Sequence, residues 1–268
     1  MHEGNRPDRR YNAHATASHS VLPYIVDPLA ERAMVSGASI SPGRIGGRFG
    51  RWIGLALLIH FVVVITVANV VRHAPAEMVW ISHVSLLVAG LGLVLNSTLL
   101  VAAALTAVGV LHGLWLIDSL SGLLFGWFPL GGTRYLLVAD PWTRAATAHH
   151  FYLAPLLFVI LWRHRAYPWT AWPLASGLFL VLSLLSRASG SPALNVNWAF
   201  RVGAVEDWWL VVAINSLSTV SYLVVLNAGA AVVLFLPVAL LMRWRVRGAG
   251  GPVRASAGTV QASRLLIP

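Results

Sequence analysis

A succession of long apolar segments, each bounded by arginines, prolines or a polar turn, constrains the fold of this chain more than any motif does. A helix needs about 20 apolar residues to cross the hydrocarbon core of a bilayer. The 268-residue chain is 57% hydrophobic and 10% charged, whereas soluble domains carry about 25% charged residues. An ordinary soluble domain is therefore excluded, and the sequence predicts an all-α, polytopic membrane helix bundle.

Dividing the apolar segments predicts six transmembrane helices: 52–71, 78–95, 99–117, 148–162, 169–185 and 222–242. The final apolar stretch, 208–242, is too long for one tilted span, so we divide it near 216–221 into a short interfacial or re-entrant helix and the sixth span. The glycine- and proline-rich segment 119–147 is expected to fold against the membrane surface. The resulting domains are an arginine-rich cytoplasmic tail (1–51), the six-helix transmembrane domain (52–242) and a basic, flexible cytoplasmic tail (243–268).

The distribution of arginine sets the predicted orientation. The chain has no lysine and no cysteine, and its formal charge is +10. Fourteen of the 19 arginines fall on one side of the six predicted spans and five on the other, and an arginine excess marks the cytoplasmic side. Both termini are therefore predicted to be cytoplasmic. We expect membrane lipids and other membrane subunits as partners, and no role for nucleic acid. Disulfides, thiolate metal sites, a cysteine nucleophile and lysine Schiff-base chemistry are excluded.

Ionisable residues inside the predicted spans point to a candidate site, because such residues are costly in a membrane and often functional. His60 lies near the middle of the first span. The other members share one depth near the outer side: His83, His112, Asp118, His149 and His150, with Thr133, Tyr135, Asn195 and Asn197 in the connections above them. We expect His83, His112, Asp118 and His150 to approach within about 10–12 Å of one another. Asp118 joins them only if the third span ends or bends near Ile117.

Three uses of this polar layer remain open. In the first, His150 acts as general base, Asp118 orients it and Thr133 is the nucleophile. In the second, His83 and His112 ligate a haem iron or a metal ion. In the third, the layer only joins helices, and the protein is an accessory subunit of a larger membrane complex. The remaining members, His149, Tyr135, Asn195 and Asn197, are candidate ligand contacts, and the two asparagines could instead cap a helix.

Several short segments carry a resemblance that covers about residues 78–242: Trp80-Ile-Ser-His83-Val-Ser-Leu-Leu, Leu114-Trp-Leu-Ile-Asp118, Pro129-Leu-Gly-Gly-Thr133-Arg-Tyr135, His150-Phe-Tyr-Leu-Ala-Pro155 and Asn195-Val-Asn197-Trp198. Together they resemble an uncharacterised family of bacterial polytopic membrane-associated proteins, and this resemblance implies a location in a bacterial inner membrane. They are more remotely similar to six-span transmembrane acyltransferases and lipid-ester hydrolases. The thiol nucleophile of the acyltransferase branch has no counterpart here, so among these activities the resemblance leaves open a threonine-and-histidine hydrolase.

The leading interpretation is an integral membrane protein with an outward-facing His/Asp site for a lipid or other amphipathic ligand, with hydrolysis as its candidate reaction. The alternatives are a non-catalytic accessory subunit and a haem- or metal-binding electron-transfer subunit.

Overall fold

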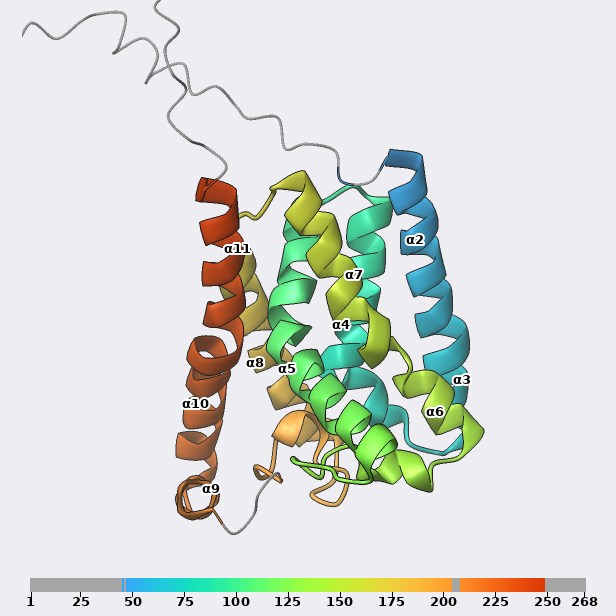
Figure 1. Ribbon diagram of the computed structural model, residues 1–268. Helices are drawn as coiled ribbons and strands as arrows, with labels where there is room; N and C mark the ends of the chain where they lie inside the picture. The colour runs from blue at the N-terminus through green and yellow to red at the C-terminus, as the bar shows by residue number, and fades with distance from the viewer. Residues whose placement is uncertain (1–44, 46, 204–207, 249–268) are drawn as a thin grey trace, which may run out of the picture. The chain divides into compact units, whose positions relative to one another are not determined.

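The computed structural model describes residues 45, 47–203 and 208–248, all within a compact unit that begins at Pro42. In these ranges every regular element is helical, as the sequence predicts (Figure 1). The helices are α2 (Gly47–Ile59), η1 (His60–Ile65), α3 (Thr66–Val71), η2 (Pro75–Val79), α4 (Ile81–Val94), α5 (Thr98–Phe125), η3 (Arg134–Leu137), α6 (Pro141–Thr147), α7 (His149–His164), α8 (Ala171–Ser189), η4 (Val196–Trp198), α9 (Trp209–Asn215), α10 (Thr219–Gly229), η5 (Ala230–Phe235) and α11 (Leu236–Gly248).

Five helical stretches are long and apolar enough to cross a membrane: Gly47–Val71, Thr98–Phe125, Pro141–His164, Ala171–Ser189 and Thr219–Arg247. They identify a multi-pass helical membrane protein. The second predicted span corresponds to α4, which has 14 residues and is about 21 Å long, shorter than the hydrocarbon core of about 30 Å. The sixth crossing therefore stays a prediction.

The helix boundaries correct parts of the predicted division. The first helix begins at Gly47, inside the segment predicted to be a tail, and α11 continues to Gly248, inside the predicted C-terminal tail. The rest of both tails, 1–44 and 249–268, lies outside the described residues. The apolar stretch 208–242 divides as predicted, into the short α9 and a long helix that begins at Thr219.

The prediction that the third span ends at Asp118 is wrong, because α5 runs on to Phe125 and ends at Gly126. Leucine and phenylalanine continue the apolar helix after Asp118, and a carboxylate is tolerated inside it because the following loop supplies hydrogen bonds, as described below. Gly126 adopts a left-handed conformation (φ 70°) and its N–H donates to the Gly122 carbonyl, which is a common way for glycine to end a helix. The start of segment 119–147 is thus part of a span.

The buried core centres on α5, which packs against α4, α7, α8 and η5. The residues from Val101 to Val108 on α5 are all buried, and alanine is the commonest among them. Small residues also let α2 and α4 cross closely: a Cβ atom added to Gly54 would lie 2.8 Å from the Gly90 carbonyl oxygen. Close packing of small side chains is what holds helices together in lipid, where the hydrophobic effect between them is absent.

The two ends of the bundle differ in charge. The start of α2 and the ends of α7 and α11 lie at one end (Figure 1). This end carries Arg48, Arg51, Arg163, Arg165, Arg243, Arg245 and Arg247, without any acidic residue among the described ones. The acidic residues of the described ranges, Glu77, Asp118 and Asp140, all belong to the opposite end, where α6 and α9 lie (Figure 1).

Candidate functional site

Five histidines converge toward the acidic end of the bundle, where η1, α4, α5 and α7 meet. The His149 ring is at their centre, with its centroid 4.2 Å from that of His150, 5.3 Å from His83, 5.6 Å from His112 and 6.0 Å from His60. The His112 and His150 rings are 4.4 Å apart. The structure thus brings together four predicted site histidines, from the three helices α4, α5 and α7, and adds His60 to them.

The junction between α6 and α7 fixes the two histidines that open α7. The Nδ1 atom of His149 lies 2.7 Å from the Ala146 carbonyl oxygen, and that of His150 lies 2.9 Å from the Thr147 carbonyl oxygen. A carbonyl oxygen only accepts hydrogen bonds, so Nδ1 must carry the proton in both rings. In each neutral imidazole this leaves the lone pair on Nε2, which is the usual arrangement of a metal-ligating histidine.

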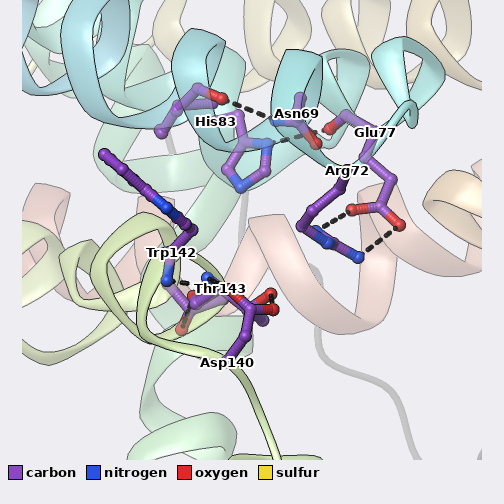
Figure 2. Close-up of polar contacts among 9 residues, drawn as sticks. Asn69, Arg72, Glu77, His83, Asp140, Trp142 and Thr143 are labelled. Carbon is purple, nitrogen blue, oxygen red and sulfur yellow. Dashed lines mark hydrogen bonds and ion pairs between the residues drawn. The ribbon is translucent and has the colours of Figure 1, made fainter.

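His83 is held in the same way from a different part of the chain. Its Nδ1 atom donates to the Glu77 carbonyl oxygen at 2.8 Å (Figure 2). The carboxylate of Glu77 in turn forms a two-pronged ion pair with Arg72, at 2.7 and 3.2 Å (Figure 2). Three of the five histidines therefore have the proton on Nδ1 and the lone pair on Nε2.

Asn197 holds the beginning of α4, the helix that carries His83. Its Oδ1 accepts from the Ile81 N–H at 2.7 Å, and its Nδ2 donates to the Val79 carbonyl at 2.8 Å and to the Ser186 hydroxyl at 2.9 Å. The bond to Ile81 satisfies an N–H in the first turn of α4, so Asn197 caps this helix from a distant segment. Of the two roles the sequence leaves open for this residue, the structure shows the cap.

Asn195 likewise serves its own loop. Its Oδ1 accepts from the N–H groups of Phe200 and Arg201, and its Nδ2 donates to the Arg201 carbonyl. Asn195 and Asn197 therefore use their amides on backbone groups and on Ser186, and the structure places neither within the histidine cluster. The other predicted ligand contact of the connections, Tyr135, lies in η3 and is 37% exposed.

Asp118 and Thr133 form a second polar group. The carboxylate of Asp118 accepts from the N–H groups of Leu130, Gly131 and Thr133 at 2.6, 3.1 and 2.8 Å, and from the Thr133 hydroxyl at 2.8 Å. These bonds tie the loop after α5 to the helix. Within the described ranges neither Asp118 nor Thr133 hydrogen-bonds to His150, so the three candidate catalytic residues are divided between two groups.

Several imidazole nitrogens in the cluster are buried without a hydrogen-bond partner in the described structure: both nitrogens of His112 and the Nε2 atoms of His149 and His60. Leaving a buried polar atom unpaired costs about 1–3 kcal/mol, so such atoms call for an explanation. The Nδ1 atom of His60 lies 3.0 Å from the Tyr152 hydroxyl.

His112, His149 and His150 have the geometry of a metal-binding group. Each offers one ring nitrogen, and these donor atoms all lie within 4.8 Å of one another. Zn–N bonds of about 2.0–2.1 Å place two nitrogens that bind the same ion at most about 4.2 Å apart. Small movements of the imidazole rings would therefore bring all three nitrogens within bonding distance of one ion. The predicted pair was His83 with His112; the structure groups His112 with the two α7 histidines, while His83 packs against His149.

Reasoning from the sequence missed His60 and Tyr152 as neighbours of the cluster. The contact between them joins residues 92 positions apart, and neither segment carries a local signal for it. The sequence also contains a signal for α6, the helix that precedes the α7 histidines. Asp140 caps α6 through the Trp142 and Thr143 N–H groups, and an Asp-Pro pair is a recognisable helix start.

Comparison with known proteins adds no assignment. No family model matches the chain. Curated proteins and solved structures give no significant match either. The candidate function therefore depends on the geometry of the histidine cluster, and the resemblance to acyltransferases and lipid-ester hydrolases stays a prediction.

Proposed function

We propose that this chain is a membrane protein with a transition-metal centre inside its helix bundle, ligated by His112, His149 and His150. The observation that carries the proposal is the set of three ring nitrogens within 4.8 Å of one another, two of whose rings have Nδ1 tied to backbone carbonyls. A bound cation would also give a partner to the unpaired Nε2 atom of His149 and to one of the two unpaired nitrogens of His112.

The donor set indicates which ions suit the site. Imidazole ligands without thiolate or carboxylate favour Zn²⁺, Cu²⁺, Ni²⁺ or Fe²⁺ over Mg²⁺ and Ca²⁺. In the described structure the carboxylates of Glu77 and Asp118 are already paired with Arg72 and with the loop after α5. The charge of a divalent ion would therefore favour an anionic fourth ligand.

Three histidines with a fourth, open position are the arrangement that activates water in catalytic zinc sites, where the pKa of the bound water falls to about 7. This chemistry supplies a nucleophile in a chain that lacks cysteine. We therefore extend the proposal to hydrolysis of an amphipathic ester at the metal, with the Asp118 and Thr133 group holding the adjacent loop.

The proposed membrane topology has six crossings and both termini in the cytoplasm of a bacterial cell, with the histidine site toward the outer side. The arginines at one end of the bundle support this orientation. If η2 and α4 cross together, residues 75–94 supply about the 20 residues that a span needs. A reporter fused after Pro268 should be active only in the cytoplasm, and activity only outside would refute this topology.

The metal proposal is tested on protein purified in mild detergent, by elemental analysis and by titration of the metal-free protein with Zn²⁺ and Cu²⁺. We expect one equivalent to bind, and a loss of affinity of at least about 100-fold in His149→Ala and His112→Ala. His164→Ala is the matched control, because His164 lies on the same helix α7 but is exposed and outside the cluster. Binding that survives in both cluster variants would refute the proposal.

The same preparation separates the alternative functions. A Soret band would replace the metal centre by haem, and a large co-purifying assembly without bound metal would favour the accessory subunit. Ester hydrolysis is measured with and without the metal, and hydrolysis that persists in the metal-free protein would refute the catalytic extension alone.

A further inference from the structure

A groove of about 350 Å³ lies between α5, α7 and α11, and all of its lining residues are apolar or glycine. Its floor on α5 extends from Leu105 to Leu116, about 16 Å along the helix axis. The α7 wall includes Ala154 and Phe158, and the α11 wall includes Val238.

Glycine keeps the groove open. A Cβ atom added to Gly113 would have no neighbouring atom within 4 Å, so the space above this residue is empty of protein. One turn earlier, a Cβ atom on Gly109 would lie 2.9 Å from a methyl group of Val238, so α11 narrows the groove there. The open part is therefore at the end nearer Gly113.

The open end shares two helices with the histidine cluster. Gly113 directly follows His112 on α5, and Ala154 lies one helical turn beyond His150 on α7. None of the cluster histidines is among the lining residues, but Gly113 and Ala154 place the groove beside two of the proposed metal ligands along α5 and α7.

We propose that the groove holds one acyl chain of a bilayer lipid, with the lipid head group at the histidine site. The inference names the class of ligand for the proposed function, and it rests on that function only for the position of the head group. All three walls belong to candidate membrane-spanning stretches, so the groove opens where the surrounding medium is hydrocarbon.

The dimensions favour an acyl chain over a helix from a second copy of the protein. A helix 16 Å long with a diameter of about 10 Å would occupy roughly 1,300 Å³, several times the volume of the groove. A volume of 350 Å³ is in the range of small-molecule pockets, about 300–1,000 Å³. A single flexible chain can also follow the groove past the narrow point at Gly109.

The test is photo-crosslinking in vesicles of phosphatidylcholine that carries a diazirine in one acyl chain. In the wild-type protein we expect labelling concentrated on the groove residues of α5, α7 and α11. The series Gly113→Ala, Gly113→Val and Gly113→Leu should reduce this labelling stepwise, with at least about a fivefold loss for leucine. Gly177→Leu is the matched control, because a Cβ atom at Gly177 on α8 also meets nothing within 4 Å and the residue lies outside the groove.

Each outcome bears on the proposal. Labelling spread evenly over the lipid-facing helices, or crosslinks that join two chains through the groove, would overturn it. Insensitivity to the whole Gly113 series, whose alanine member introduces no clash, would also overturn it. Measuring Zn²⁺ binding in the same variants keeps the two proposals distinguishable: Gly113→Leu should retain the metal, and His149→Ala should lose the metal while groove labelling persists.

Discussion

Replacing Asn197 by alanine tests how the end of the bundle around the histidines is held together. The side chain is 1% exposed and makes three hydrogen bonds, to Ile81, Val79 and Ser186. At about 1 kcal/mol each, their loss costs about 3 kcal/mol. Asn197 also has a left-handed backbone (φ 54°), which costs alanine about 1 kcal/mol more. The expected loss in the free energy of unfolding is about 4 kcal/mol.

Two further variants separate these contributions. Asn197→Gly removes the bonds but tolerates the left-handed conformation, so it should cost about 3 kcal/mol. Asn96→Ala is the matched control: Asn96 has a similar backbone (φ 58°), and its side-chain oxygen has no hydrogen-bond partner in the described structure. This variant should cost only about 1 kcal/mol.

The assay is equilibrium unfolding in detergent, followed by tryptophan fluorescence, together with hydrogen exchange of the Ile81 amide. Exchange at Ile81 should accelerate in both Asn197 variants and stay unchanged in Asn96→Ala. If Asn197→Ala destabilises the protein no more than Asn96→Ala, or if Ile81 stays protected, the amide does not hold α4 and the reasoning is refuted.

Three other substitutions test single interactions. Burial raises the pKa of Tyr167 to about 12, so this phenol stabilises the fold below its ordinary pKa near 10 and its contribution is lost as the pH rises through 12. Tyr167→Phe should cost about 1 kcal/mol at neutral pH, because Thr106 keeps its bond to the Ala102 carbonyl. Unfolding curves recorded at several pH values check both points. Hydrogen bonds from the side chain and N–H of Thr143 lower the pKa of Asp140, so the α6 cap is complete above the ordinary carboxyl pKa near 4 and is lost as the pH falls below it. Asp140→Asn should make the stability of α6 less dependent on acid pH, and hydrogen exchange of the α6 amides measures this. Asp118→Asn replaces one acceptor oxygen by an N–H₂ group that faces N–H donors, so it should destabilise the loop by about 2 kcal/mol. Amide hydrogen exchange at Leu130, Gly131 and Thr133 should accelerate. Unchanged exchange at these amides would show that Asp118 does not hold the loop.

Much of the helical fold could be predicted because each membrane helix satisfies its own backbone within one apolar segment. The exceptions have local causes. The end of α5 was placed too early because Asp118 reads as a helix terminus until the loop that pairs with it is known. Contacts between distant segments, such as Asn197 with Val79 across 118 positions, leave no periodic pattern to read.

The candidate site could be predicted in part. Residues at the same depth on neighbouring spans are expected to converge, and this criterion identifies His83, His112, His149 and His150. Depth does not give the rotation of each helix about its axis, so the central place of His149 could not be obtained in this way. The π-helical turn η1, which begins at His60, changes that rotation further, and no feature of its sequence, HFVVVI, predicts a π-helical turn.

The way polar groups are paired separates structural residues from the candidate site. Asn197 and Asp118 are both 1% exposed, and every one of their side-chain oxygens and nitrogens is hydrogen-bonded. His112 is equally buried and neither of its nitrogens is paired. Polar residues that only join helices gain stability from complete pairing, whereas unpaired buried donors and acceptors reduce stability and persist where function requires them. Binding a cation would pair one nitrogen of His112 and reduce this cost. His112→Leu should therefore abolish metal binding and leave the metal-free protein at least as stable as the wild type.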